Sequence, residues 1–306
     1  MTNQGNATTV CGLPAWIAFP ANDSASYVND ALAVGVNVPL GIFAFFSNLI
    51  IIVTVAKTPR LQRPSNILLC SLAAIDCLVG LTSQPLFFIW RLMLHRARQS
   101  CYLQTELFES RYVLNTLTLG GSFAIFTLIS FDRARALSDP LSYRTKVTNK
   151  GIAKITVITA SAWVLVTILL HFVIPESLLP QHTLLTIGVI FILLPAINHM
   201  RMFLAIRRHN SQMVGQVNEQ QLSTVFGREK KVAVDMTIVV VILFACLGPM
   251  IVIKLAFQSF LPEVYDLLYP WAFTMTYINS SINPFLYLKR NGELRIAVRS
   301  VVCSCF

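Results

Sequence analysis

An aspartate lies inside an apolar stretch of the chain, where a carboxylate needs a partner. Asp76 is surrounded by leucine and alanine, and if this stretch crosses a bilayer, the charged side chain costs roughly 2.5 to 3.5 kcal/mol. It therefore requires a cation or a proton. Hydroxyl and amide residues of other apolar stretches can reach a similar depth: Asn48, Ser122, Asn279, Ser280 and Asn283. Two chemistries stay open, an oxygen cage for a hard cation and a hydrogen-bond network around a protonated carboxyl group.

The residues that enzymes use are not arranged for catalysis in this chain. The sequence contains no His-Glu-x-x-His motif, no nucleophile elbow and no glycine-rich phosphate loop. Its histidines are scattered near the ends of apolar runs. We therefore predict that the protein is not an enzyme and has no catalytic residues.

The elements that would position Asp76 are apolar runs long enough to cross a membrane. The 306 residues are 55% hydrophobic and 12% charged, and the mean hydropathy of +0.64 is high for a soluble domain. A spanning helix needs roughly 20 apolar residues. Runs of this length cover approximately residues 32–56, 66–90, 110–131, 152–173, 184–206, 232–260 and 267–288. The predicted fold is an all-α membrane protein, a seven-transmembrane helix bundle.

Lysine and arginine gather in alternate joints between these runs, which indicates the orientation of the bundle. The cation-rich side is predicted to be cytosolic, so the N-terminus lies outside. Two glycosylation sequons, at Asn6 and Asn22, agree with this orientation. The net charge of +10 is explained by anionic lipid and a cytosolic partner, and it does not indicate nucleic acid.

The same pattern divides the chain into three parts. Residues 1–31 form an extracellular segment without the features of a secretory leader, so the first helix would serve as the insertion signal. Residues 32–288 form the transmembrane domain. Residues 289–306 form a short amphipathic eighth helix and a cytoplasmic tail.

Short motifs in successive helices resemble those of the rhodopsin-like (class A) G-protein-coupled receptors. Asn283-Pro284-Phe285-Leu286-Tyr287 resembles the NPxxY motif, Leu72 to Asp76 resembles LAxxD, and Asp132-Arg133-Ala134 resembles the DRY triplet. Single positions of the first, fourth, fifth and sixth helices match as well: Asn48, Trp163, Pro195 and Pro249. One motif per helix, in order, makes the resemblance specific over nearly all of residues 32–300.

The resemblance implies a plasma-membrane receptor that binds an extracellular ligand and activates a heterotrimeric G protein, with arrestin as a further partner. It implies no required cofactor and a sodium ion as allosteric ligand, in a pocket formed by Asp76, Ser122, Asn279, Ser280 and Asn283. It also implies a helix network that includes Asn48, Pro249 and Pro284.

The resemblance further implies a G-protein switch at the cytosolic end, formed by Asp132, Arg133, Glu229 and Tyr287. Arg133 has two candidate carboxylate partners, its neighbour Asp132 and the more distant Glu229. A pair of Arg133 with Glu229 would lock the third helix to the sixth. The alternative is that both are ordinary interface charges.

The chain departs from the family pattern at several positions. Leu247 stands where the sixth helix usually carries tryptophan, so a smaller aliphatic contact must couple ligand to this helix. Ala134 and Phe203 replace two tyrosines, and Phe108 occupies the position of a cysteine that forms the family disulfide.

The remaining cysteines suggest two modifications. Cys11 and Cys101 are predicted to lie outside and to form a disulfide, with two free thiols as the alternative. Cys303 and Cys305 follow the amphipathic segment and suit palmitoylation.

The ligand is constrained mainly by exclusion. The seventh helix has no lysine for retinal, with Tyr277 at that position, and Asn115 replaces the aspartate of monoamine receptors. The predicted pocket residues are Asn115, Lys254, Phe273 and Tyr277. Lys254 would attract an anionic ligand group or, alternatively, extend toward the membrane interface. The short second outer loop and the missing disulfide resemble the melanocortin, cannabinoid, lysolipid and adenosine receptors.

A polytopic secondary transporter is the alternative function. Transporters of this kind show internal repeats, paired broken helices and several buried charges along a pathway. The sequence shows no repeat, and Asp76 is nearly alone at membrane depth. The prediction remains a receptor whose sixth helix moves outward on activation.

Overall fold

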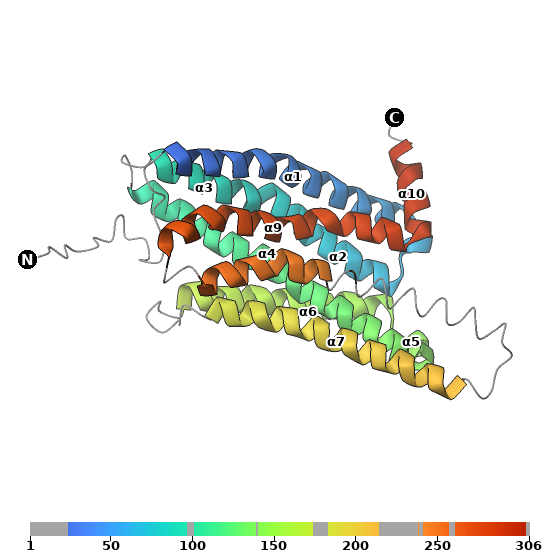
Figure 1. Cartoon of the computed structure of the whole chain (residues 1–306). Helices are drawn as coiled ribbons and strands as arrows, with labels where there is room; N and C mark the ends of the chain where they lie inside the picture. Colours follow the sequence, from blue (N-terminus) through green and yellow to red (C-terminus); the bar gives the residue numbers. More distant parts are fainter. Residues whose placement is uncertain are drawn as a thin grey trace, which may run out of the picture.

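The chain folds as an elongated bundle of helices that run side by side (Figure 1). The computed structural model describes residues 24–96, 101–138, 140–173, 183–213, 238, 241–256 and 261–303. Every regular element within these ranges is helical. Helices are expected here because a membrane offers the backbone no water, and a helix satisfies its own hydrogen bonds.

The first half of the bundle contains the helices that surround Asp76. α1 (Ser24–Lys57) contains Pro39 and is followed by the short η2 (Pro59–Leu61). α2 (Pro64–Leu78) continues through a π-helical turn, η3 (Val79–Ser83), into α3 (Gln84–Arg96). α4 (Cys101–Ser138) is the next helix, and α1 packs against α2 and α3.

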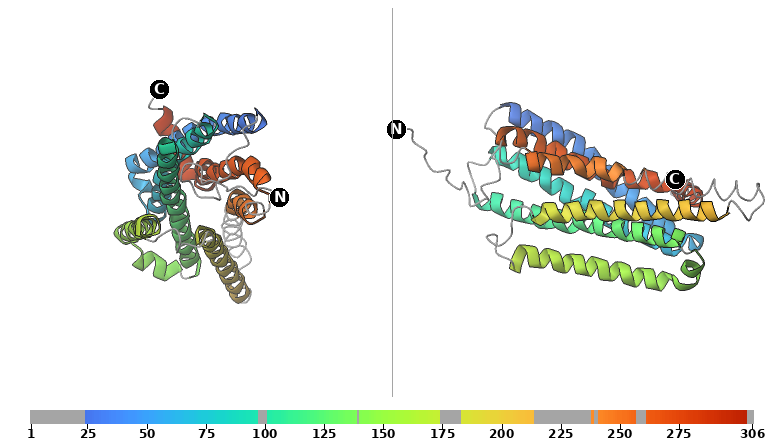
Figure 2. Two further views of the ribbon diagram at one scale, coloured as in Figure 1. Left: turned by 90° about the vertical axis from the view of Figure 1, so that its left-hand side faces the viewer. Right: turned by 60° about the horizontal axis from the view of Figure 1, so that its bottom comes forward.

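The second half begins with the short α5 (Pro140–Lys146) and α6 (Asn149–Ile168), whose N-terminus is capped by the Thr148 hydroxyl. η4 (Leu169–Val173) extends α6. α7 (Thr183–Met213) packs on α4, followed by the helix Val241–Ala256 and by α9 (Pro262–Arg290), which packs on α1. α10 (Gly292–Cys303) turns across the end of the bundle (Figures 1 and 2).

Each predicted apolar run overlaps a helix of the structure. Four helical stretches are long and apolar enough to cross a membrane by length and composition: Ser24–Lys57, Pro64–His95, Thr105–Ala136 and Asn149–Val173. The all-helical architecture is therefore confirmed. The assignment of seven spans, the outside N-terminus and the role of α10 as a membrane-surface helix stay predictions.

The bundle has an apolar exterior and a partly polar interior. Large hydrophobic side chains are well exposed on several helices, among them Phe46, Val157 and Leu165. Asn37, Asn48, Asp76 and other polar residues are instead buried. Such an arrangement is expected of a protein surrounded by lipid, in which polar groups face one another inside the bundle.

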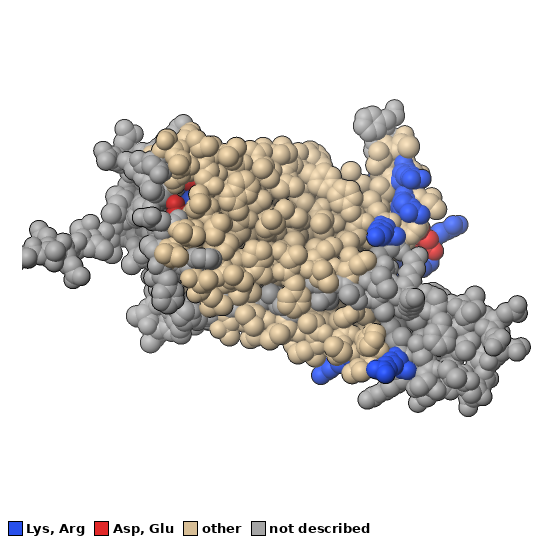
Figure 3. All heavy atoms as spheres, viewed as in Figure 1, with Lys and Arg blue, Asp and Glu red and all other residues tan. Residues whose placement is uncertain are grey.

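Charged side chains mark the two ends of the bundle. In Figure 3 the visible lysines and arginines gather at the end that carries α10, and acidic side chains are visible at both ends. The long side between the two ends is almost free of charge in this view. A band without charge between two charged ends matches the apolar core of a bilayer.

Two glycines allow the close approach of neighbouring helices. A Cβ atom at Gly80 would lie 2.5 Å from the backbone oxygen of Gly41, and one at Gly120 would overlap the ring of Trp163. The indole of Trp163 donates to the carbonyl of Thr116 at 2.9 Å. The contacts of α1 with η3 and of α4 with α6 thus depend on small residues, as is common between membrane helices.

Candidate functional site

Asp76 is the centre of a buried polar site between α2, α4 and α9. Its side chain is fully buried, and Oδ1 accepts hydrogen bonds from Ser122 Oγ at 3.1 Å and Ser280 Oγ at 2.8 Å. Asn283 Nδ2 donates to Oδ2 at 2.7 Å. Three helices therefore meet at one carboxylate, which three donors stabilise in its charged form.

Asn48 extends this site toward α1. Its Nδ2 donates to the backbone oxygen of Ser280 at 3.0 Å and to that of Ala44. Its Oδ1 is buried and has no hydrogen-bond partner among the described residues. Asn279 is also buried, but it makes no hydrogen bond to Asp76.

The residues of this site suit a small hard cation. Carboxylate, hydroxyl and amide oxygens are its preferred ligands, and the Ser122 and Ser280 hydroxyls keep lone pairs while they donate to Asp76. Asp76 forms no ion pair with lysine, arginine or histidine in the part of the chain that the structure describes. The site could thus supply oxygen ligands together with one negative charge.

A second polar site lies at the end of α4. Asp132 Oδ1 accepts a hydrogen bond from the Tyr143 hydroxyl at 2.7 Å, and Oδ2 lies 3.1 Å from Arg133 Nη2. Burial and the hydrogen bond to Asp132 raise the pKa of Tyr143 to about 12, so the hydroxyl keeps its proton and remains a donor. Arg133 thus pairs with its neighbour here, whereas Glu229 lies outside the described residues.

The predicted contact residues at the opposite half of the bundle come from three helices. Tyr277 is fully buried and donates to Asn115 Oδ1 at 2.9 Å. Phe273 stacks on Phe87 with 4.4 Å between ring centroids. Lys254 is partly buried on the helix Val241–Ala256. Three of the four predicted pocket residues therefore belong to the same aromatic region of the interior.

No sequence pattern marked Arg111 as a pocket residue. The structure buries it to 1% exposure among aromatic rings, with its guanidinium carbon 4.2 Å from the centroid of Trp90. Arg111 lies one helical turn before Asn115 on α4, so it joins the predicted pocket. A cation at a helix end can face water or the interior, and the sequence alone does not indicate which.

Arg91 was missed for the same reason and forms a buried ionic cluster with α1 and α9. It contacts Asp30 through Nε at 3.1 Å and Nη2 at 3.0 Å, and Asp266 through Nη1 at 2.7 Å. His95 Nε2 lies 2.7 Å from the second oxygen of Asp30. We call these four residues the outer clamp, because they join three helices at the end opposite α10.

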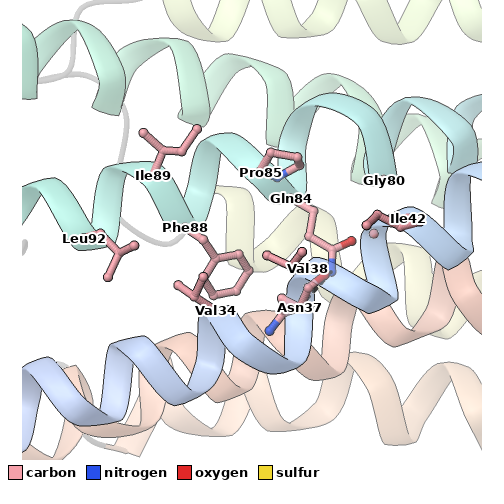
Figure 4. A pocket seen from close by; sticks show the side chains of 11 residues that line it. Val34, Asn37, Val38, Ile42, Gly80, Gln84, Pro85, Phe88, Ile89 and Leu92 are labelled. Atoms are coloured by element: carbon pink, nitrogen blue, oxygen red, sulfur yellow. Dashed lines mark hydrogen bonds between the residues drawn. The ribbon is translucent and has the colours of Figure 1, made fainter.

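A groove of about 310 Å³ lies elsewhere, between α1 and α3 (Figure 4). Its walls include Val38, Ile42, Phe88 and Ile89, with Gln84 and Asn37 at its base. None of the four predicted pocket residues lines it. Ile42 and Ile89 are well exposed, so the groove opens on the apolar exterior of the bundle.

The helix Val241–Ala256 lies within the sixth predicted span, so we call it the sixth helix, and it meets α4 through a small hydrophobic cluster. Leu247 is buried and belongs to one hydrophobic cluster with Phe123 and Leu243. Pro249 lies within the same helix. Pro284 lies inside α9, which continues past it as one helix. Tyr287 is buried in a second cluster near α10, with Leu72 and Leu294.

Several predicted residues cannot be placed. Cys11, Asn6, Asn22 and Cys305 lie outside the described residues, as does the side chain of Cys101. Cys303 is exposed at the end of α10. The disulfide, the glycans and the acyl chains stay predictions.

Comparison with known proteins gives matches along the whole bundle. A family model described as 7 transmembrane receptor (rhodopsin family) matches residues 47–181, and one described as Serpentine type 7TM GPCR chemoreceptor Srv matches residues 170–303. The chain is 26% identical to adenosine receptor A2a of Cavia porcellus over 311 residues, covering 90% of this chain and 74% of that one. It is 27% identical to melanocortin receptor 3 of Mus musculus over 283 residues, covering 87% and 84%. Trace amine-associated receptor 9 of Mus musculus is 25% identical over 308 residues, covering 85% and 81%.

Proposed function

Because the chain belongs to the rhodopsin-like family of G-protein-coupled receptors, we propose that it binds an extracellular ligand within the bundle and activates a heterotrimeric G protein. It is a multi-pass membrane receptor and not an enzyme, as its relatives are receptors. The plasma membrane is its proposed location. The observation that carries the proposal is the series of polar sites along the interior, from Asn115 through Asp76 to Asp132. Such a series can connect a ligand at one end with a partner at the other.

The proposed activation step is an outward movement of the sixth helix at the cytosolic end. The hydrophobic cluster of Leu247, Leu243 and Phe123 would act as its pivot against α4, in place of the usual tryptophan. Leucine offers less contact area than indole, so this pivot would resist rotation less. A ligand that binds the moved state more tightly then shifts the population toward it.

The Asp76 site is proposed to hold sodium and to stabilise the resting state. Asp76, Ser122 and Ser280 would supply oxygen ligands, and Asn283 would orient the carboxylate. Bound sodium would tie α2, α4 and α9 together through the charge of Asp76. The alternative is the hydrogen-bond network without a cation, which the same contacts permit.

A functional test measures nucleotide exchange in membranes that contain the full chain and a panel of chimeric G proteins. We expect at least one G protein to bind a labelled GTP analogue, either in the basal state or with a compound library. Arg133→Ala at equal surface amount should abolish the response, because Arg133 would contact the G protein. No exchange with any member of the panel would contradict the proposal and favour the transporter.

Tyr143→Phe is expected to raise basal exchange. The variant removes the donor that holds Asp132 beside Arg133, and a hydrogen bond to a charged group contributes about 1.5–3 kcal/mol. A rise of roughly tenfold in basal exchange would follow if the bond belongs to the resting state. Tyr102→Phe, at an exposed position near the start of α4, is the matched control and should change nothing. A fall in basal exchange would instead assign the bond to the active state.

A further inference from the structure

Arg111 is a buried cation whose immediate neighbours are aromatic. Its guanidinium carbon lies 4.2 Å from the ring centroid of Trp90, 4.9 Å from that of Phe108 and 5.5 Å from that of Phe87. Aromatic faces attract a cation but cannot accept all of its hydrogen bonds. The planar edge of the guanidinium, with its N–H groups, is therefore the part that still needs a partner.

Arg91 shows how this chain satisfies a buried arginine. Arg91 is 2% exposed and Arg111 is 1% exposed. Arg91 contacts two carboxylates, those of Asp30 and Asp266. Among the described residues, Arg111 forms no ion pair, and its one hydrogen bond is a long contact of 3.5 Å with the Tyr269 hydroxyl. Buried arginines are rarely left in this condition without a function.

The neighbourhood of Arg111 has a surplus of hydrogen-bond donors. Arg111 Nε, Trp90 Nε1 and Asn115 Nδ2 are buried and have no acceptor in the described part of the chain. The side-chain oxygen of Asn115 already accepts a hydrogen bond from Tyr277, so its NH₂ group is the part that can donate to a ligand. The hydroxyl of Tyr265, beside Tyr269, also lacks a partner there. Such a set needs an acceptor-rich group.

We propose that Arg111 anchors an anionic ligand of this receptor through a carboxylate or phosphate group. The inference rests on the proposed receptor function and adds the chemical class of the ligand. A guanidinium binds such groups with two parallel N–H···O bonds, which its unpartnered edge can supply. The surrounding rings of Trp90, Phe108 and Phe273 favour an apolar or aromatic body next to the anionic group.

The same anionic group would also contact Lys254 and would thereby connect the ligand to the sixth helix. Lys254 lies on the helix Val241–Ala256, whose residues Met250 and Ile253 pack against the aromatic cluster around Arg111, so its positive charge and that of Arg111 repel each other. An oxyanion placed between them would replace this repulsion with attraction to both. The outer end of the sixth helix would then move toward α4, and Pro249 lies within this helix between Leu247 and Lys254. This gives the receptor a trigger that does not need the missing tryptophan.

The binding test uses purified full-length receptor in nanodiscs, without G protein. Unfolding temperature is recorded against increasing sodium phosphate in one arm and sodium benzoate in another, with sodium chloride at equal ionic strength as reference. We expect a saturable rise in at least one arm. Arg111→Gln should weaken the apparent affinity at least about tenfold, since it removes the charged partner of a buried pair. Lys254→Gln should weaken it less.

Two controls separate binding from folding. Arg299→Gln, on α10, removes a cation at the other end of the bundle and should keep the full response. Arg111→Gln without added anion should unfold at a temperature no lower than the wild type, because it removes a buried charge without a carboxylate partner. A response that is absent in the wild type, or equal in wild type and Arg111→Gln, would overturn the proposal.

A second measurement identifies the ligand class through signalling. Pairs of aromatic carboxylic acids and their methyl esters, and of phosphates and their neutral triesters, are applied to cells that express the receptor. Active compounds should be found among the charged members only, and Arg111→Gln should remove their response. Activation by neutral members alone would contradict an anionic ligand. Because anion binding is measured without G protein, its failure leaves the receptor function standing, and a failed exchange assay leaves the binding result standing.

Discussion

Arg91→Met is expected to destabilise the folded receptor by about 3–5 kcal/mol, the range observed when one partner of a buried ion pair is removed. The substitution keeps an apolar stem of similar length but leaves Asp30 and Asp266 without their shared cation. Both carboxylates are buried, so water cannot replace the guanidinium. The measurement is the unfolding temperature of purified receptor, together with the fraction that reaches the cell surface.

The matched control for Arg91→Met is an exposed ion pair of an arginine with a carboxylate. Arg63 Nη2 lies 3.4 Å from Glu293 Oε2, and the two side chains are 61% and 60% exposed. Arg63→Met should change stability by about 1 kcal/mol or less, because exposed pairs are solvated and screened. A second test combines Arg91→Met with Asp30→Asn and Asp266→Asn, which should recover much of the loss. Equal stability of Arg91→Met and the wild type would show that the outer clamp does not hold the bundle.

The outer clamp shows what sequence reasoning could not reach. Arg91 and Asp266 lie near the ends of apolar runs, where charged residues usually meet water. The rotation of each helix about its axis decides whether the side chain faces water or the interior of the bundle. The position of an apolar run in the chain indicates that a helix exists but not its rotation about its axis. Only the packing of α1, α3 and α9 places Asp30, Arg91 and Asp266 together.

Elements were easier to predict than their ends. The apolar runs located every long helix, because a bilayer of fixed thickness demands roughly 20 apolar residues per span. The run predicted at 110–131 lies within α4, which begins at Cys101 and ends at Ser138. A helix can continue beyond the apolar core of the membrane with polar residues, and a search for apolar runs does not detect these polar ends. The apolar run at 66–90 does not indicate the π-helical turn at Val79–Ser83.

Residues at the candidate sites were predictable to different degrees. Asp76 and Asn283 lie in recognisable motifs, and the family resemblance implied Ser122 and Ser280 as their neighbours. The structure brings the four residues together within hydrogen-bond distance. Asn279 was expected in the same set and makes no bond to Asp76, since its neighbour Ser280 takes that place. Arg111 had no motif to mark it. The only signal was its position one helical turn before Asn115, which does not indicate whether the side chain faces water or the interior.

Sodium binding at Asp76 is expected to make receptor stability depend on the type of cation at constant ionic strength. Sodium chloride should raise the unfolding temperature relative to the chloride of a bulky organic cation that cannot enter the bundle. Ligand linkage gives about 1.4 kcal/mol when sodium exceeds its dissociation constant tenfold. If sodium favours the resting state, it should also lower agonist affinity, by a factor within the usual allosteric range of about 5 to 150.

Asp76→Asn separates the cation site from a hydrogen-bond network. The amide keeps the shape and one acceptor oxygen for Ser122 and Ser280, but it carries no charge to attract sodium. The variant should therefore keep the fold and lose the difference between sodium and the organic cation. Ser280→Ala should weaken the sodium response. Ser281→Ala is the control for α9, because Ser281 is buried but bonds to the backbone oxygen of Leu40.

The outcomes of this experiment assign the role of Asp76. Loss of the sodium response in Asp76→Asn, with an intact response in Ser281→Ala, would identify Asp76 as the ligand that carries the charge. A wild type that unfolds at the same temperature in both cations would instead favour a protonated Asp76 that only joins α2, α4 and α9 by hydrogen bonds. In that case Asp76→Asn should leave both stability and agonist affinity unchanged, because a neutral carboxyl group and an amide can occupy the same network. The charge of one buried residue thus decides whether the centre of the bundle responds to an ion or serves only to hold three helices together.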